Sequence, residues 1–83
     1  MMRITLRQLQ IFIAIAQSGS TTAAGEIIAL SQSAISASIA ELEKALNVQL
    51  FDRVGKRLLL NDHGRAMLPQ AMALVNGATS LEN

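Results

Sequence analysis

The sequence has no cysteine, tryptophan or tyrosine, and it has only two phenylalanines. The absence of cysteine excludes a disulfide scaffold and thiolate zinc sites. With so few aromatic side chains, the chain lacks a platform on which the bases of single-stranded nucleic acid could stack. No apolar run approaches the roughly 18 residues that span a membrane, and the first residues do not have the pattern of a signal peptide. We therefore expect a soluble, cytoplasmic protein.

Motifs for catalysis are missing as well. There is no glycine-rich phosphate loop, no His-Glu-x-x-His pair and no cysteine nucleophile. His63 is the single histidine and no cluster of further ligands accompanies it, so we interpret it as a surface residue at a helix start. Nothing here supports an enzyme, and we expect neither a cofactor nor a metal site.

Hydrophobic residues make up 51% of the 83 residues, a large share for a chain with room for one small domain. Spare apolar surface on a small domain suggests that a second chain covers part of it. The net charge is only +1, which by itself is a weak argument for a nucleic-acid partner. The basic residues are concentrated, however, because residues 44–65 carry five against two acidic ones, a local charge of +3. The five are Lys44, Arg53, Lys56, Arg57 and Arg65.

A first helix is predicted at about residues 5–18 from apolar residues at helical spacing. It has two apolar stripes on nearly opposite faces, which indicates a helix that lies between two partners. We expect one stripe to pack in the core of the domain and the other to meet the last helix. The stripes consist of Leu6, Leu9, Ile13 and Ala16, and of Ile4, Ile11 and Ile15.

Two further helices are predicted in quick succession, at about residues 21–29 and 31–46. Each begins at a serine, a favourable N-cap, and Asn47 is suited to end the second. A single residue, Leu30, separates the two helices, so the turn must be tight and the crossing steep. The caps are Ser20 and Ser31. The residues expected to be buried are Ala24, Ile27 and Ile28 in the shorter helix and Ile35, Ile39, Leu42 and Leu46 in the longer one.

The rest of the chain is predicted to form a β-hairpin and a last helix. Two short apolar runs, residues 48–53 and 57–60, flank a basic, glycine-containing loop. Asn61 or Asp62 is expected to cap a helix that reaches towards the C-terminus, with a kink at Pro69. Its apolar residues recur at spacings of 4, 3, 4 and 3, which is typical of a helix face, or seam, that packs against another helix. We therefore predict dimerisation through Met67, Ala71, Leu74, Ala78 and Leu81, together with Ile11 and Ile15 of the first helix.

A helix, a tight turn and a second helix whose outward face begins with small, uncharged residues form the helix-turn-helix pattern. Such a recognition helix, here about residues 31–46, enters the major groove by its N-terminal end, where bulky or acidic groups would clash or repel. Gln32 has the amide that pairs with adenine, and alanine leaves room for a thymine methyl. The predicted DNA contacts of this helix are Ser31, Gln32, Ser33, Ser36 and Ala37.

The basic loop at residues 53–57 is predicted to act as a wing that holds phosphates, with Lys56 nearest the minor groove. Arg53 and Arg57 complete this set, and Thr22, which opens the second helix, is either a further phosphate contact or an ordinary helix-start residue. Spacing alone leaves open a generic three-helix bundle with a solvated charged hairpin. The competing function is an adaptor domain that dimerises without nucleic acid. Retention on DNA at low salt, lost at high salt, separates the two functions.

Five segments of the chain form a set. They are Leu-Arg-Gln-Leu-Gln-Ile-Phe at residues 6–12, Ser-Gly-Ser at 18–20, Leu-Ser-Gln-Ser-Ala-Ile-Ser at 30–36, Leu-Phe-Asp-Arg at 50–53 and Leu-Asn-Asp-His-Gly at 60–64. This set resembles the N-terminal domain of LysR-type transcriptional regulators, and the resemblance covers essentially the whole chain.

The resemblance implies a mainly α fold: a winged helix-turn-helix of three helices and a short β-hairpin, followed by a long linker helix that pairs antiparallel with a partner chain. Residues 1–61 would bind double-stranded DNA sequence-specifically for a transcription regulator, and residues 62–83 would begin the linker. The expected assembly is a homodimer, with a tetramer left open for the full-length protein, whose larger effector-binding domain is not in this chain. Where the family usually has proline, arginine and a polar or basic residue, this sequence has Ser33, Ala37 and Ala40, so fewer charged contacts to bases are expected.

Overall fold

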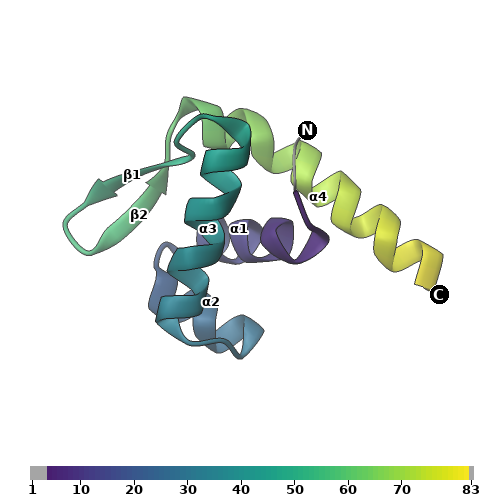
Figure 1. Cartoon of the computed structure of the whole chain (residues 1–83), viewed down its shortest axis with the longest axis horizontal. Coiled ribbons are helices and arrows are strands. Elements are labelled where there is room, and N and C mark those ends of the chain that lie inside the picture. The colour runs from purple at the N-terminus through teal and green to yellow at the C-terminus, as the bar shows by residue number, and fades with distance from the viewer. Residues whose placement is uncertain (1–3, 83) are drawn as a thin grey trace.

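The computed structural model describes residues 4–82, with side chains described as far as Ala78. Figure 1 shows three helices packed together, a hairpin that projects at one end and a last helix that extends away at the other. The predicted mainly α architecture, three helices with a hairpin wing and a long fourth helix, is confirmed. In chain order the elements are α1 (Leu6–Ser18), α2 (Thr21–Ile28), α3 (Gln32–Leu46), β1 (Phe51–Val54), β2 (Arg57–Leu60) and α4 (Asp62–Glu82).

The first three helices begin and end at residues that satisfy their free backbone groups. The hydroxyl oxygens of Thr5, Ser20 and Ser31 each accept a hydrogen bond from the backbone N–H three residues on, at 3.1, 3.0 and 3.2 Å. The predicted serine caps and the predicted end of α3 are therefore confirmed. At the C-terminal ends the backbone turns left-handed at Gly19, Ala29 and Asn47, with φ of 81, 63 and 57°.

The turn between α2 and α3 is as tight as the sequence predicts, and the two helices cross at 103°. Leu30 N donates to Gly25 O at 3.0 Å. A Cβ on Gly25 would lie 2.6 Å from Leu30 O, so only glycine fits at this position without a shift of the turn. Among the described residues no single helix is long and apolar enough to span a membrane; α2 and α3 pass that test only when taken together.

Helix α1 runs through the core and packs against α2, α3 and α4. The prediction of partners on both of its faces is thus confirmed, and α4 of the same chain is one of them. Ile11 and Ile15 are 1% and 0% exposed within the single chain. Both belong to the hydrophobic core of the single chain, so the prediction that they form a dimer interface is wrong: they have no free surface for a second copy.

Burial also differs from expectation in α2. Ile27, which we expected to be buried, is 64% exposed and lines an open pocket between α1, α2 and Val75 of α4. Its neighbour Ile28 is half-buried against the core, as is Leu46 at the end of α3.

The wing is a two-stranded antiparallel hairpin in which Phe51 pairs with Leu60 and Val54 pairs with Arg57. Its strands start later than the predicted apolar run, at Phe51 rather than at residue 48. Two contacts fix it to the core. The rings of Phe12 and Phe51 meet edge to face with centroids 5.5 Å apart. In addition, Leu58 N donates a hydrogen bond to the carbonyl oxygen of Gly19, in the turn between α1 and α2, at 3.0 Å.

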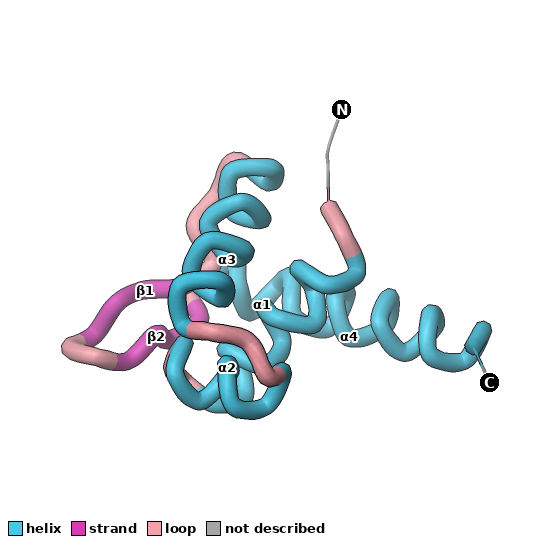
Figure 2. The backbone as a smooth tube through the Cα atoms, turned by 60° about the horizontal axis from the view of Figure 1, so that its bottom comes forward, coloured by secondary structure: helices cyan, strands magenta, loops and turns pink. Residues whose placement is uncertain are grey.

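Helix α4 begins at the predicted cap, since Asn61 Oδ1 accepts from Gly64 N at 2.9 Å. The helix continues through Pro69 to its end, and its first half lies along α1, with Ala71 fully buried. Figure 2 shows the second half leaving the body of the molecule. Leu74, on this projecting part, is 61% exposed.

Candidate nucleic-acid interface

The first half of α3 presents a smooth outward face opposite its buried stripe of Ile35, Ile39 and Leu42. The side chains on that face are glutamine, serine and alanine, and α3 has no charged residue before Glu41. The N-terminal end of the helix is open, because Ser31 is exposed and bonds only to the backbone of its own first turn. The exposed residues of the face include Ser31, Gln32, Ser33, Ser36, Ala37 and Ala40.

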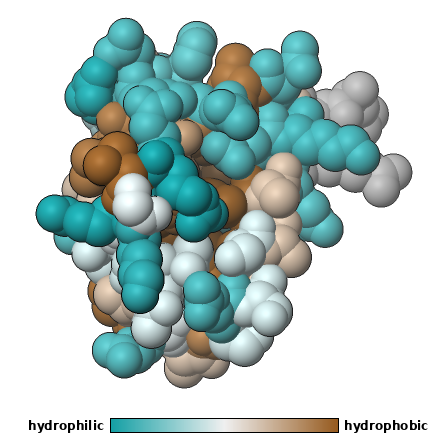
Figure 3. Space-filling model, turned by 90° about the vertical axis from the view of Figure 1, so that its left-hand side faces the viewer, coloured by the Kyte–Doolittle hydropathy of each residue, from teal (hydrophilic) through white to brown (hydrophobic). Residues whose placement is uncertain are grey.

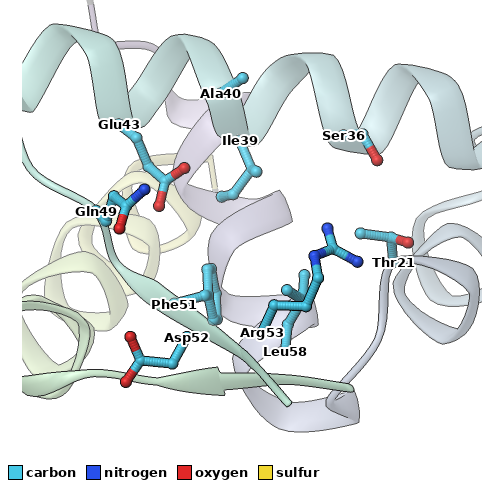
Figure 4. A pocket seen from close by; sticks show the side chains of 10 residues that line it. All are labelled: Thr21, Ser36, Ile39, Ala40, Glu43, Gln49, Phe51, Asp52, Arg53 and Leu58. Atoms are coloured by element: carbon cyan, nitrogen blue, oxygen red, sulfur yellow. The ribbon is translucent and has the colours of Figure 1, made fainter. Parts of the chain in front are cut away.

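A groove of about 420 Å³ separates α3 from the wing. Its floor contains Ile39 and Phe51, and its walls come from α2, α3 and both strands. Figure 4 shows Arg53 reaching from β1 towards Ser36 on α3 and Thr21 at the start of α2. A guanidinium is thereby held beside the N-terminal half of the outward face.

The acidic residues near this groove lie away from that guanidinium. Asp52 points to the opposite side of β1 from Phe51 and Arg53 (Figure 4), as alternation along a strand requires. Glu43 lies at the far end of the groove, beside Gln49, and its Oε2 accepts a hydrogen bond from Leu50 N at 2.7 Å. The groove is therefore basic where it meets the start of α3.

The other two basic residues of the wing are exposed. Lys56 lies at the tip of the hairpin after Gly55, whose φ of 62° permits the two-residue loop. The guanidinium of Arg57 lies over Gly19, with Nη2 3.6 Å from where a Cβ on that glycine would stand. In the described part of the chain the only ion pair joins Arg65 and Asp62, so no carboxylate neutralises the wing cations.

All nine sequence-predicted DNA contacts are exposed, and they come from α2, α3 and the wing. Figure 3 views this end of the molecule and shows mostly hydrophilic and near-neutral residues, with a few hydrophobic ones between them. The nine are Thr22, Ser31, Gln32, Ser33, Ser36, Ala37, Arg53, Lys56 and Arg57.

The sequence reasoning missed two polar residues that hold this face in place. Gln8, only 7% exposed, accepts from Thr5 N at 3.0 Å and donates to Glu41 Oε2 of α3 at 3.5 Å. The spacing of Thr5 and Gln8 is that of a capping box, a signal that was available in the sequence. No role was predicted for Glu43, whereas the structure gives its carboxylate a backbone partner, Leu50 N, in the connection to β1.

The residues predicted for dimerisation fall into two groups. Ala71, like Ile11 and Ile15, is buried inside the single chain, so it has no free surface. Met67 and Ala78 are half-buried, and Leu74 is exposed. Leu81 lies outside the residues whose side chains are described.

Residues 6–65 match the model of the family described as "Bacterial regulatory helix-turn-helix protein, lysR family". The chain belongs to the LysR family. Over 81 residues this LysR-family chain is 57% identical to the "Uncharacterized HTH-type transcriptional regulator YeiE" of Escherichia coli, covering 98% of the chain and 28% of that protein. It is 36% identical to the "RuBisCO operon transcriptional regulator" of Allochromatium vinosum, with 98% and 27% covered. The chain thus spans little more than a quarter of these relatives, which are named as regulators and not as enzymes.

Solved structures of LysR-type proteins have the same fold. The "Crystal structure of CbnR_DBD-DNA complex" superimposes with a TM-score of 0.90 at 32% identity, covering 95% of this chain and 91% of that one. The oxidized form of Corynebacterium glutamicum OxyR gives 0.92 at 32% identity, covering 95% of this chain and 24% of that one. In both cases the similarity covers nearly the whole of this chain.

Proposed function

We propose that this chain binds double-stranded DNA in a sequence-specific manner, as the DNA-binding part of a LysR-type transcription regulator. The observation that carries the proposal is the joint exposure, on one side of the molecule, of the uncharged start of α3 and of a wing whose cations have no carboxylate partner. A surface of this kind admits an α-helix to the major groove and offers cations to the flanking phosphates. Membership of the LysR family supports it.

Base reading is assigned to the first two turns of α3. Gln32 stands at the first position of the helix with its side chain exposed, where its amide can pair with adenine. Ser33 and Ser36 can donate to base edges or phosphates, and Ala37 can meet a thymine methyl. Ser31 adds the N-terminal end of the helix, which favours a phosphate.

Phosphate binding is assigned to the wing and to the start of α2. Arg53 and Arg57 both lie close to the beginning of α2, where Thr22 is exposed. Lys56, at the tip of the hairpin, is the residue best placed for the minor groove. These contacts fix register and orientation without reading sequence.

We propose that residues 1–61 form the DNA-binding domain and that residues 62–83 begin a linker helix that pairs with that of a second copy. Leu74 is the centre of this proposed seam, flanked by Met67 and Ala78. A large apolar side chain that is 61% exposed on a projecting helix is stabilised by covering it with another helix. Because the proposed ligand is bacterial DNA, the site of action is the cytoplasm.

The direct test is selection of bound duplexes from a random pool, followed by sequencing of the enriched sites. We expect a two-fold symmetric site with half-site centres roughly one helical turn, or a multiple of it, apart. Enriched duplexes that share no sequence would show that the chain binds DNA non-specifically. Absence of binding even at low salt would favour the alternative, an adaptor domain that dimerises without nucleic acid.

A further inference from the structure

The short connection from α3 to β1 is tied to the recognition helix by one side chain. Oε2 of Glu43, in the last turns of α3, accepts a hydrogen bond from Leu50 N at 2.7 Å. The carboxylate is half-buried, which shields this charge-assisted bond from water. Leu50 itself is buried, so its backbone can shift only if the core moves with it.

The same connection is tied from its other side to the start of α4. Asn61 N donates to Leu50 O at 3.0 Å, and Asn61 Nδ2 donates to Gln49 O at 2.9 Å. The packing here is close, because a Cβ on Gly64 would lie 2.1 Å from Leu50 O. The peptide groups of residues 49–50 are thus clamped between the end of α3 and the beginning of α4. We call this arrangement the 49–50 clamp.

Helices α3 and α4 are otherwise joined chiefly through α1, against which both pack. Apolar packing is non-directional and allows small rotations more readily than hydrogen bonds do. Leu74 lies twelve residues from the start of α4, about 18 Å along the helix. A rotation of α4 by about 5° at the clamp would move Leu74 by roughly 1.6 Å relative to the recognition helix. In a symmetric dimer the displacements of the two copies would add to about 3 Å. This shift is close to the roughly 3.4 Å that separates successive base pairs.

We propose that Glu43 and Asn61 are positioning residues that set the angle between the recognition helix and α4, and through it the half-site spacing that a dimer reads. The proposal rests on the proposed function, because it requires two copies that pair through α4 on DNA. Neither residue contacts DNA in this account. They act through the 49–50 clamp, so their loss should change which spacing is preferred more than it changes binding to a half-site.

The test measures relative affinities for the selected site and for versions with one base pair inserted or removed at its centre. The wild-type chain should prefer one spacing by about tenfold or more. Glu43→Ala, which removes the acceptor of Leu50 N, should reduce that preference to about threefold or less. Glu43→Gln loses the same charge but keeps an acceptor oxygen, and it should keep the wild-type preference. Comparing the two variants removes the effect of the charge itself.

Asn61→Asp is the second variant, chosen because it should fold. Aspartate still accepts from Gly64 N as the cap of α4, but it cannot donate to Gln49 O. It should also weaken the spacing preference, with circular dichroism unchanged. The inference is overturned if Glu43→Ala and Asn61→Asp keep the wild-type spacing preference and lose affinity equally at every spacing. A wild-type chain without any spacing preference would contradict the proposed dimer as well.

Discussion

At the scale of single residues, the recognition face is unusual for its lack of charge. Where the resemblance to the family leads one to expect arginine, α3 has Ala37, and Ala40 one turn later is equally short. Alanine contributes shape and a methyl contact but no electrostatic attraction. Sequence discrimination must then depend on Gln32 and the serines, while attraction to the phosphate backbone must come from the wing.

This division of labour predicts that two substitutions behave differently. Gln32→Ala should cost about 1–3 kcal/mol on the selected site and relax one base position, because it removes a bidentate contact. Lys56→Ala should weaken binding to all duplexes and lower the slope of log affinity against log salt by about one. Titrations on selected and scrambled duplexes over a salt series measure both effects. Gln17→Ala, an exposed glutamine of α1 away from this face, is the control. Equal weakening of all sequences by Gln32→Ala would refute its base-reading role.

At the scale of secondary-structure elements, two glycines of α4 have opposite surroundings. A Cβ on Gly64 would meet Leu50 O and a side-chain carbon of Leu60 at 2.1 and 2.7 Å, whereas nothing lies within 4 Å of one on Gly77. Both are helical, so alanine would improve the intrinsic helix propensity at either position. Packing should therefore decide whether a substitution by alanine raises or lowers the free energy of unfolding.

Gly64→Ala should lower the free energy of unfolding by about 2–3 kcal/mol, because α4 must move off the 49–50 clamp. Gly77→Ala should raise it by up to about 1 kcal/mol, since the exposed helix gains propensity at no steric cost. Urea denaturation followed by circular dichroism measures both changes. A neutral Gly64→Ala variant would mean that the start of α4 is not held as closely as the structure shows.

Much of the element layout could be predicted because its signals are local. Ser20, Ser31 and Asn47 mark helix ends through bonds to their own backbone neighbourhood, and these positions were right. Helical periodicity indicated two covered faces on α1, but periodicity cannot say whether the cover belongs to the same chain. This is why Ile11 and Ile15 were assigned to a dimer interface, whereas the core of the single chain buries them.

The parts that could not be predicted depend on contacts between distant segments. The bond from Leu50 N to Glu43 crosses the end of α3, and the bond from Asn61 to Gln49 spans the whole hairpin. No spacing rule connects such pairs before the fold is known. Likewise Ile27 is 64% exposed, and helical spacing alone does not say which apolar residues of a short helix stay uncovered. The DNA-facing residues, by contrast, could be chosen from sequence because a helix-turn-helix fixes its outward face by helical geometry alone.

At the scale of the whole molecule, the proposed DNA-binding face and the proposed dimer seam are at opposite ends. The wing and the start of α3 lie at one end, and the projecting half of α4 lies at the other (Figure 1). Such an arrangement suits two copies that meet through α4 and present two recognition helices outward. A net charge of only +1 makes one copy a weak ligand for DNA, so pairing is needed for tight binding at physiological salt.

The dimer predicts that Leu74→Asp should abolish association, because it would place an unpaired charge in the seam at a cost of several kcal/mol. The single chain should stay folded, since Leu74 is already 61% exposed in it. Asn76→Asp adds the same charge about 200° further around the helix, at an exposed position, and serves as the control. Sedimentation should give a dimer for the wild type and for the control, and a monomer for Leu74→Asp. Monodisperse species of one size for all three would contradict the seam.

The most direct test of the central claim, sequence-specific binding by a two-fold pair, is a titration of the chain on three duplexes at about 0.15 M salt. The duplexes are the full selected site, one half-site in the same length of DNA, and a scrambled sequence. Pairing roughly doubles the phosphate contacts and makes the second binding event intramolecular, so affinity for the full site should exceed that for the half-site by about 100-fold or more. Affinity for the half-site should in turn exceed affinity for the scrambled duplex. Equal affinity for the full site and the half-site would contradict the account, because one copy would then suffice.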